Sequence, residues 1–101
     1  MANLIPFAFE SVTVSTSAVG LTSATYAPAG EQAAVEAFVT VETAAIAYLF
    51  DGTTPTVGAT ILGHQASSTA SFRIRSASDI QNFLAIRTGG SDATIRVTYF
   101  R

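Results

Sequence analysis

His64 is the only histidine in the chain and the first candidate for a catalytic or metal-binding role. As a metal ligand or general base it would need partners, and the nearest acid in the sequence is Asp51, thirteen residues away. Metal sites use three or four ligands, usually at short spacings, and the chain has no cysteine to supply thiolates. The pattern therefore predicts a histidine at a strand end with ordinary hydrogen bonds.

Two aspartates offer a second possibility. Asp51 and Asp79 could form the carboxylate pair of a glycosidase, but nothing around them in the sequence indicates a shared cleft. Asp51 precedes Gly52 and is expected to cap a turn, and Asp79 falls in an expected first helical turn, where negative charge is favoured. Thr88–Gly90 is followed by neither a helix nor a lysine, so it is no phosphate loop. The sequence predicts no active site, no cofactor and no metal.

The composition indicates association with other proteins. The chain has 101 residues, which is enough for one domain with a single core. Only 12% of them are charged, compared with about 25% in an average soluble domain. All five basic residues are arginines, which are preferred over lysine at desolvated contacts. Because a neutral surface promotes association, we expect the chain to work in a multimeric assembly.

Charge and hydropathy argue against several other classes. A net charge of −2 gives no basic field for nucleic acid. The first twelve residues lack the positive and apolar regions of a secretory signal. The stretch Glu31–Asp51, which has no Gly or Pro, includes Glu36 and Glu42, whereas a membrane span takes about 20 mostly apolar residues. We expect no nucleic-acid partner and no membrane segment.

The arginines admit two interpretations. Four of them lie on expected strands and the fifth ends the chain, in the order Arg73, Arg75, Arg87, Arg96 and Arg101. Gathered on one face, they would hold acidic groups of a partner protein. Alternatively, they are solvated outward positions of half-buried strands. The sequence leaves both interpretations open.

Alternation with a period of two predicts strands in the first half of the chain. Residues 9–17 are expected to form an edge strand, with Phe9, Ser11, Thr13 and Ser15 on one face and Glu10, Val12, Val14 and Thr16 on the other. Leu21–Tyr26 is expected to be a second, short strand that ends in a turn around Pro28 and Gly30.

Residues 32–50 permit either a helix or two strands. A helix would place Phe38, Val41, Ala45 and Tyr48 on one stripe. Residues 35–43, however, are rich in β-branched side chains, which disfavour helix, and they place Val35, Ala37, Val39 and Val41 on one face. We therefore expect two strands with a tight reversal near Glu42–Ala44.

The second half continues in the same way. Strands are expected over residues 57–65 and 68–77, and in the latter Phe72 and Ile74 alternate with Arg73 and Arg75. Ser78, three residues before Gln81, has capping-box spacing and predicts a helical turn at Asp79–Asn82. The last two strands flank a Gly-Gly-Ser-Asp connection, which predicts a hairpin. Its second strand would turn Ile95, Val97 and Tyr99 toward the core and Arg96 and Thr98 outward.

Seven or eight short strands with one helical turn predict an all-β fold, an antiparallel sandwich or small barrel of immunoglobulin-like or jelly-roll-like type. We expect a single domain over residues 11–101, preceded by an apolar arm over residues 1–10. Pro6 resists regular ladder pairing, so the arm either docks on its own domain or anchors in a neighbour. We favour the neighbour, with an interface formed by Leu4, Ile5, Phe7, Phe9, Arg73, Arg75 and Arg96.

A family resemblance adds to this interpretation. The resemblance begins with the segment SVTVSTSAVGLTSATY and covers nearly the whole chain from Ser11. Its further motifs are a strand with the pattern VET.AI.Y..DG..PT, a following Gly-His, and a final segment I..F.AIR…A.I.VTYF. In this order they resemble small proteins encoded among the virion structural genes of tailed bacteriophages and prophages. The resemblance implies a virion component and, within that class, a capsid decoration (cement) protein.

The turn in this pattern has a second resemblance. The segment AYLFDGTTPT looks like a hairpin in immunoglobulin-like modules of hexosaminidases and other carbohydrate-active enzymes, where it is structural. Gly52, after Asp51, would supply a positive φ, and Pro55 would fix the exit of the turn. We therefore expect Asp51, Gly52 and Pro55 to form a structural turn.

Together these observations predict a non-enzymatic protein of the phage particle. It would be made in the bacterial host cytoplasm, lie on the capsid surface, and contact the major capsid protein, other copies of itself, or both. A tail, neck or fibre component is the alternative within this class. A carbohydrate- or host-surface-binding module is the alternative from another class, with Tyr26 and Tyr48 as candidate contacts.

Overall fold

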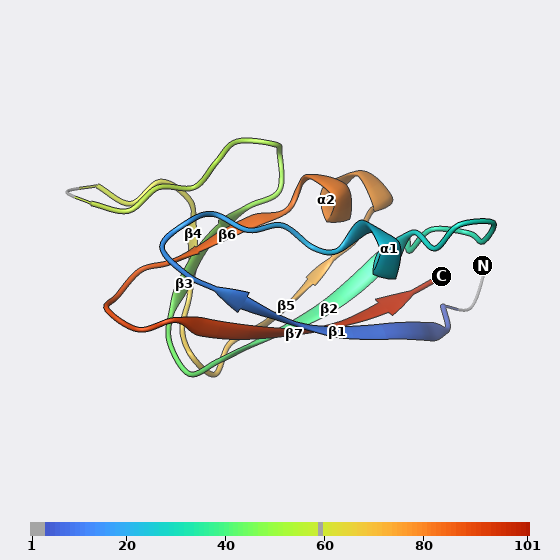
Figure 1. Ribbon diagram of the computed structural model, residues 1–101, viewed down its shortest axis with the longest axis horizontal. Helices are drawn as coiled ribbons and strands as arrows, with labels where there is room; N and C mark the ends of the chain where they lie inside the picture. The colour runs from blue at the N-terminus through green and yellow to red at the C-terminus, as the bar shows by residue number, and fades with distance from the viewer. Residues whose placement is uncertain (1–3, 59) are drawn as a thin grey trace.

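The computed structural model describes residues 4–58 and 60–101, which form two antiparallel β-sheets packed as a sandwich (Figure 1). The four-stranded sheet has the order β1-β7-β2-β5, with β1 at Pro6–Val14, β7 at Ala93–Phe100, β2 at Glu36–Glu42 and β5 at Ser71–Ile74. The three-stranded sheet has the order β4-β3-β6, with β4 at His64–Ala66, β3 at Ile46–Leu49 and β6 at Leu84–Arg87.

The predicted all-β sandwich is confirmed, and the barrel alternative is wrong because the two sheets have separate edges. The described residues contain seven strands and two short helices, α1 (Ser23–Tyr26) and α2 (Ala77–Asn82), where one helical turn was expected. Neither helix is long and apolar enough to cross a membrane.

Helix α1 replaces the strand expected at Leu21–Tyr26. The carboxylate of Glu10 in β1 accepts hydrogen bonds from both the backbone N–H and the hydroxyl of Thr22. The N–H groups of Thr25 and Tyr26 in turn donate to the Thr22 carbonyl, which closes a helical turn. A contact twelve residues away in sequence thus overrides the local strand preference.

The capping residue of α2 also differs from the expectation. The helix begins at Ala77, and the hydroxyl of Ser76, rather than that of Ser78, accepts a hydrogen bond from the Asp79 N–H. Ser76 is in extended conformation, as a helix cap requires, whereas Ser78 already lies within the helix.

The hairpin predicted for the last two strands is wrong, because β6 and β7 belong to different sheets and the connection between them crosses the sandwich. β2 and β3 also lie in different sheets, and the tight reversal predicted near Glu42–Ala44 connects them. In this turn the Ala44 N–H donates to the Glu42 carbonyl, and Thr43 has a φ of 77°. Of the successive strands in the described residues, only β3 and β4 are hydrogen-bonded neighbours. The strand expected over residues 57–65 is reduced to β4, preceded by an isolated bridge between Thr56 and Leu62.

β1 begins earlier than the alternation indicated. It starts at Pro6 and pairs with β7 as far as Phe100, with an irregularity between Pro6 and Ala8. Proline at the first residue of an edge strand leaves no ladder hydrogen bond unmade. The expected boundary between arm and domain, at residue 10, therefore falls inside β1; residues 1–3 of the arm lie outside the described residues.

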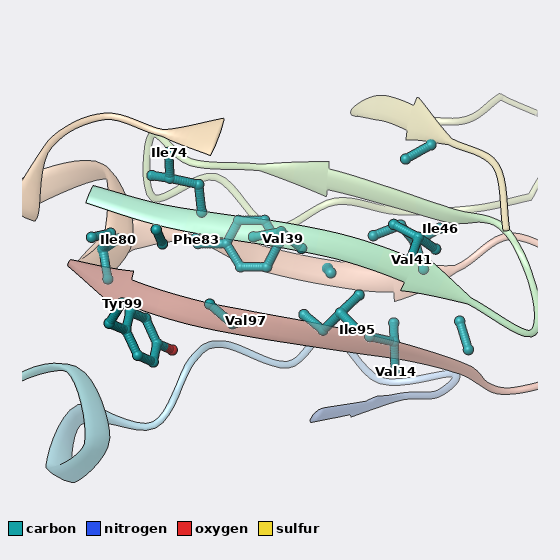
Figure 2. Packing of buried hydrophobic residues seen from close by; sticks show 14 of the residues in the cluster. Val14, Val39, Val41, Ile46, Ile74, Ile80, Phe83, Ile95, Val97 and Tyr99 are labelled. Carbon is teal, nitrogen blue, oxygen red and sulfur yellow. The ribbon is translucent and has the colours of Figure 1, made fainter. Parts of the chain in front are cut away.

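The core lies between the two sheets (Figure 2). β2 and β7 each alternate between buried and outward residues, as predicted, and β7 buries Ala93, Ile95, Val97 and Tyr99. The Tyr48 ring of β3 stacks on the Phe72 ring of β5, with centroids 4.3 Å apart, and so joins the two sheets. Helix α2 and the residue after it add Ile80 and Phe83 to the same core.

The edge strand β1 is held to the core by a partly buried polar contact. Glu10 points inward, and its carboxylate accepts a hydrogen bond from the hydroxyl of Tyr99, a fully buried residue. Burial and then the contact with Glu10 raise the pKa of the Tyr99 hydroxyl far above its usual value. Tyr99 is therefore a neutral donor under all ordinary conditions.

The turn after β3 has the local geometry that its sequence requires. The side chain of Asp51 accepts a hydrogen bond from the Thr53 N–H at 2.9 Å, and this contact lowers the pKa of the carboxyl. Gly52 has φ of 89°, and Pro55 is fully buried. A side chain at position 52 would be strained even though a Cβ there would meet only the Asn82 Oδ1, at 4.0 Å.

We predict that Gly52→Val lowers the free energy of unfolding by about 1 kcal/mol or more, the scale of backbone strain at an unfavourable φ. Gly89→Val is the matched control, because a Cβ at Gly89 would meet no atom within 4 Å and its φ is not positive. Urea denaturation of both variants checks this, and equal midpoints would contradict it.

We predict that Tyr99→Phe lowers the free energy of unfolding at pH 7 by about 1.5–3 kcal/mol, the range for a hydrogen bond to a charged group. Tyr26→Phe is the control, since within the described part of the chain its hydroxyl makes no hydrogen bond. The raised pKa gives the pH dependence: the stabilisation is present below the unfolded tyrosine pKa of about 10 and is lost as the pH rises above it. Denaturation at pH 7 and above pH 10 measures both effects, and a constant difference would contradict the assignment.

Candidate interaction surface

The solvent-facing side of the four-stranded sheet is the most distinctive surface of the molecule, and we call it the outer face. Because side chains alternate along each strand, the residues between the buried ones all lie on this side. The outer face consists of Phe9, Ser11 and Thr13 of β1, Thr94, Arg96, Thr98 and Phe100 of β7, Glu36, Phe38, Thr40 and Glu42 of β2, and Ser71 and Arg73 of β5.

Three phenylalanines gather at one end of the outer face. Strand pairing places Thr98 opposite both Phe9 and Phe38, so these two rings flank it on neighbouring strands. Phe100 lies two residues further along β7. Phe9 is 57% exposed, and Ile5, which directly precedes β1, is 63% exposed. Large apolar side chains that are this exposed lower the solubility of a free monomer.

Arg73 covers part of this aromatic end. Its guanidinium carbon lies 5.2 Å from the centroid of the Phe38 ring and 5.8 Å from that of Phe100. The same guanidinium forms an ion pair with Glu36 at 2.6 Å. Arginine is suited to this double contact because its flat group can stack on rings and still donate along its edge.

The charges of the outer face cancel. Arg96 pairs with Glu42, just as Arg73 pairs with Glu36, so the two acids and two bases that the strands place here leave no net charge. Such exposed pairs contribute only about 0–1 kcal/mol each to stability. Their consequence is that a partner can cover the face without burying an unpaired charge.

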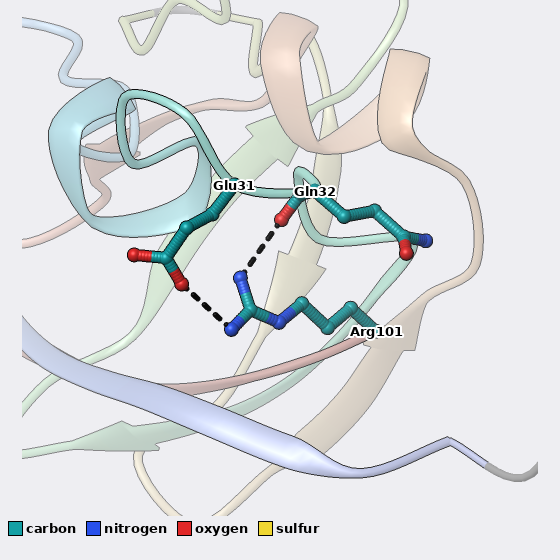
Figure 3. A network of polar contacts seen from close by, with 3 residues as sticks. All are labelled: Glu31, Gln32 and Arg101. Atoms are coloured by element: carbon teal, nitrogen blue, oxygen red, sulfur yellow. Dashed lines mark hydrogen bonds and ion pairs between the residues drawn. The ribbon is translucent and has the colours of Figure 1, made fainter.

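Arg101 closes the end of the sandwich next to this surface (Figure 3). Its guanidinium donates to the Gln32 carbonyl at 3.1 Å and to the Glu31 carboxylate at 2.8 Å. Its guanidinium carbon lies 4.1 Å from the centroid of the Phe7 ring, which also packs against the core. Phe7 is thereby engaged within its own chain.

The structure brings together part of the interface set predicted from the sequence. Phe9, Arg73 and Arg96 share the outer face, and Leu4 and Ile5 are exposed just before β1. Phe7 is half-buried under Arg101, and Arg75 follows β5 as an exposed residue. The arginines form no single stripe, because Arg87 lies in the other sheet and pairs with Asp92. Phe38 and Phe100 were not among the predicted interface residues, although alternation in β2 and β7 marks both as outward.

The side chains first considered for chemistry lie elsewhere. His64 is exposed on β4, with its ring centroid 5.6 Å from that of Tyr48 and 6.0 Å from that of Phe50. Asp51 is engaged in its turn, and Asp79 lies in the first turn of α2. Across residues 4–58 and 60–101 there is no pocket and no group of three potential metal ligands.

Comparisons with known proteins give no match to a protein-family model, to a curated protein or to a solved structure.

We predict that the exposed and buried phenylalanines differ sharply in their effect on stability. Phe9→Ala should change the free energy of unfolding by less than about 1 kcal/mol, because the ring is mostly in solvent. Phe83→Ala, at a residue 1% exposed, should cost about 3–5 kcal/mol. Guanidinium denaturation compares them, and a large loss for Phe9→Ala would mean that the outer face serves the fold of the single chain.

Proposed function

We propose that this chain is a non-enzymatic structural protein of a tailed-phage particle, a decoration protein that binds the assembled head shell through its outer face. The observation that carries the proposal is the aromatic end of that face, where Phe9, Phe38 and Phe100 gather without net charge. The resemblance of the sequence to small virion proteins supports the phage particle as the setting.

The physical argument begins with the exposed apolar side chains. Burial of one phenylalanine side chain is worth about 1.5–3 kcal/mol, and Phe9 and Ile5 are both more than half exposed in the single chain. A shell subunit that covers them gains this free energy. Because Arg73 and Arg96 bring their counter-ions with them, the desolvation cost of the charged groups is reduced.

The mechanism is stabilisation by mass action. A protein that binds only the assembled shell shifts the equilibrium toward that state by an amount set by its concentration relative to its dissociation constant. Shell stability should therefore rise with the amount of bound protein. The major capsid protein is the proposed partner, and the outside of the virion the proposed location.

The test uses heads of the phage whose genome encodes this chain, prepared without the protein. We predict that added wild-type chain co-sediments with the heads and raises their thermal disruption temperature. The double variant Ile5→Ser/Phe9→Ser should lose most of the binding, by about tenfold or more, since 1.4 kcal/mol is a factor of ten in affinity.

The matched control is Val57→Ser/Leu62→Ser, which removes two exposed apolar side chains from the β3–β4 connection instead. It should bind like the wild type. Equal loss in both variants would contradict a role for the outer face. Recovery of the chain with purified tails, and absence from heads, would replace the decoration role with that of a tail component.

A further inference from the structure

We infer that the free edge of β1 is a self-association site, at which β1 of a second copy adds as an antiparallel strand about a two-fold axis at Ser11. The inference concerns the backbone edge of β1 and does not rest on the proposed virion role. It would join two four-stranded sheets into one continuous sheet.

The backbone pairing shows which groups of β1 are available. Arg101, just after β7, exchanges both of its backbone hydrogen bonds with Ile5, and the Phe100 carbonyl instead accepts from Val35 next to β2. In an antiparallel ladder successive residues point their backbone groups to opposite sides. Tyr99, Val97 and Ile95 therefore bond to β1, at their partners Ala8, Glu10 and Val12.

The intervening residues Phe9, Ser11 and Thr13 then direct their N–H and C=O groups away from β7. β1 is the terminal strand of its sheet, and no other segment of residues 4–58 and 60–101 pairs with it. These three alternate residues, whose backbone groups point away from β7, give an edge long enough to pair with another strand. An open edge of this kind is a template for pairing.

The outward side chains of this edge carry no charge, and the one charged residue of β1, Glu10, points inward, where it is engaged by Thr22 and Tyr99. Proteins commonly guard an edge with lysine or another charge, with proline, or with a very short strand. The outward side chains of β1 between residues 9 and 13 are Phe, Ser and Thr, and its proline stands only at the start, at Pro6. The opposite edge of the same sheet, β5, has four residues and carries Arg73. Of the two edges, β1 is the one suited to a partner.

A second copy is the occupant because β1 is complementary to itself. A two-fold axis at Ser11 pairs Ser11 with its counterpart and Phe9 with Thr13 of the other copy, which gives about six backbone hydrogen bonds. An axis at Glu10 would set two carboxylates directly opposite each other, which is destabilising. An axis at Phe9 would draw the irregularity between Pro6 and Ala8 into the pairing.

The register is tested with single cysteines, since the chain has none of its own. In the proposed dimer the two Ser11 Cα atoms lie about 5.5 Å apart, within the range for a disulfide. We predict that Ser11→Cys forms a covalent dimer under mild oxidation of the purified protein. Thr13→Cys, on the same face and strand, is the control. Its two copies would stand about 13 Å apart along the strand, so it should stay monomeric.

Proline tests the role of the backbone edge itself. Ser11→Pro removes an N–H that points away from β7, so the single chain keeps the hydrogen bonds between β1 and β7. The proposed dimer, in which both copies carry the substitution, loses two hydrogen bonds between the chains. Sedimentation equilibrium should show a dissociation constant raised about tenfold or more. Ser11→Lys, which keeps the N–H but sets two like charges opposite each other, should have the same effect if the proline variant folds poorly.

Three results would overturn the inference: a wild-type chain that remains monomeric at every concentration, equal cross-linking of Ser11→Cys and Thr13→Cys, or unchanged association of both Ser11→Pro and Ser11→Lys. Because every measurement uses the purified chain without phage particles, these results are independent of the head-binding test.

Discussion

The two-residue period of β7 is the constraint on which the rest of the structure depends. This strand is paired on both sides and buries every second side chain from Ala93 to Tyr99. The side chains between them must then point to solvent, and they contribute Arg96, Thr98 and Phe100 to the outer face. Because a slip of one residue would exchange the two sets, the free energy of the core also sets the register of the surface. Core and candidate interface are two sides of one strand.

Local sequence patterns predicted the strands of this fold much better than they predicted which strands pair with one another. Alternation placed the buried residues of β2 and β7 correctly, because each strand carries that information in its own side chains. The expected terminal hairpin was wrong, because Gly89–Asp92 permits both a tight turn and a crossing between sheets, and the choice depends on the pairing of β7 with β1 and β2. The helix at Ser23–Tyr26 was missed for a similar reason, since Glu10 fixes its first turn from another strand.

The candidate surface could be predicted from the sequence only in part. Arg73 and Arg96 were identified because each alternates with apolar neighbours on its own strand, and Phe9 because it lies in the apolar amino-terminal segment. Their meeting on one face, together with Phe38 and Phe100, depends on a sheet order of β1-β7-β2-β5 that no local pattern contains. Phe7 differs from Phe9 because it lies at the irregularity in β1 and under Arg101, the last residue of the chain.

The chemistry of the arginine side chain connects the absence of lysine to the character of the outer face. A lysine ammonium is a strongly hydrated point charge, and covering it with a partner is costly. Arg73 instead lies over two aromatic rings while its edge pairs with Glu36, so both its flat group and its charge have partners inside the same chain. Removal of Glu36 would leave the guanidinium charge without its counter-ion while the rings stay in place. The ion pair, though it adds little to stability, therefore governs how readily the aromatic end of the outer face can be taken out of water.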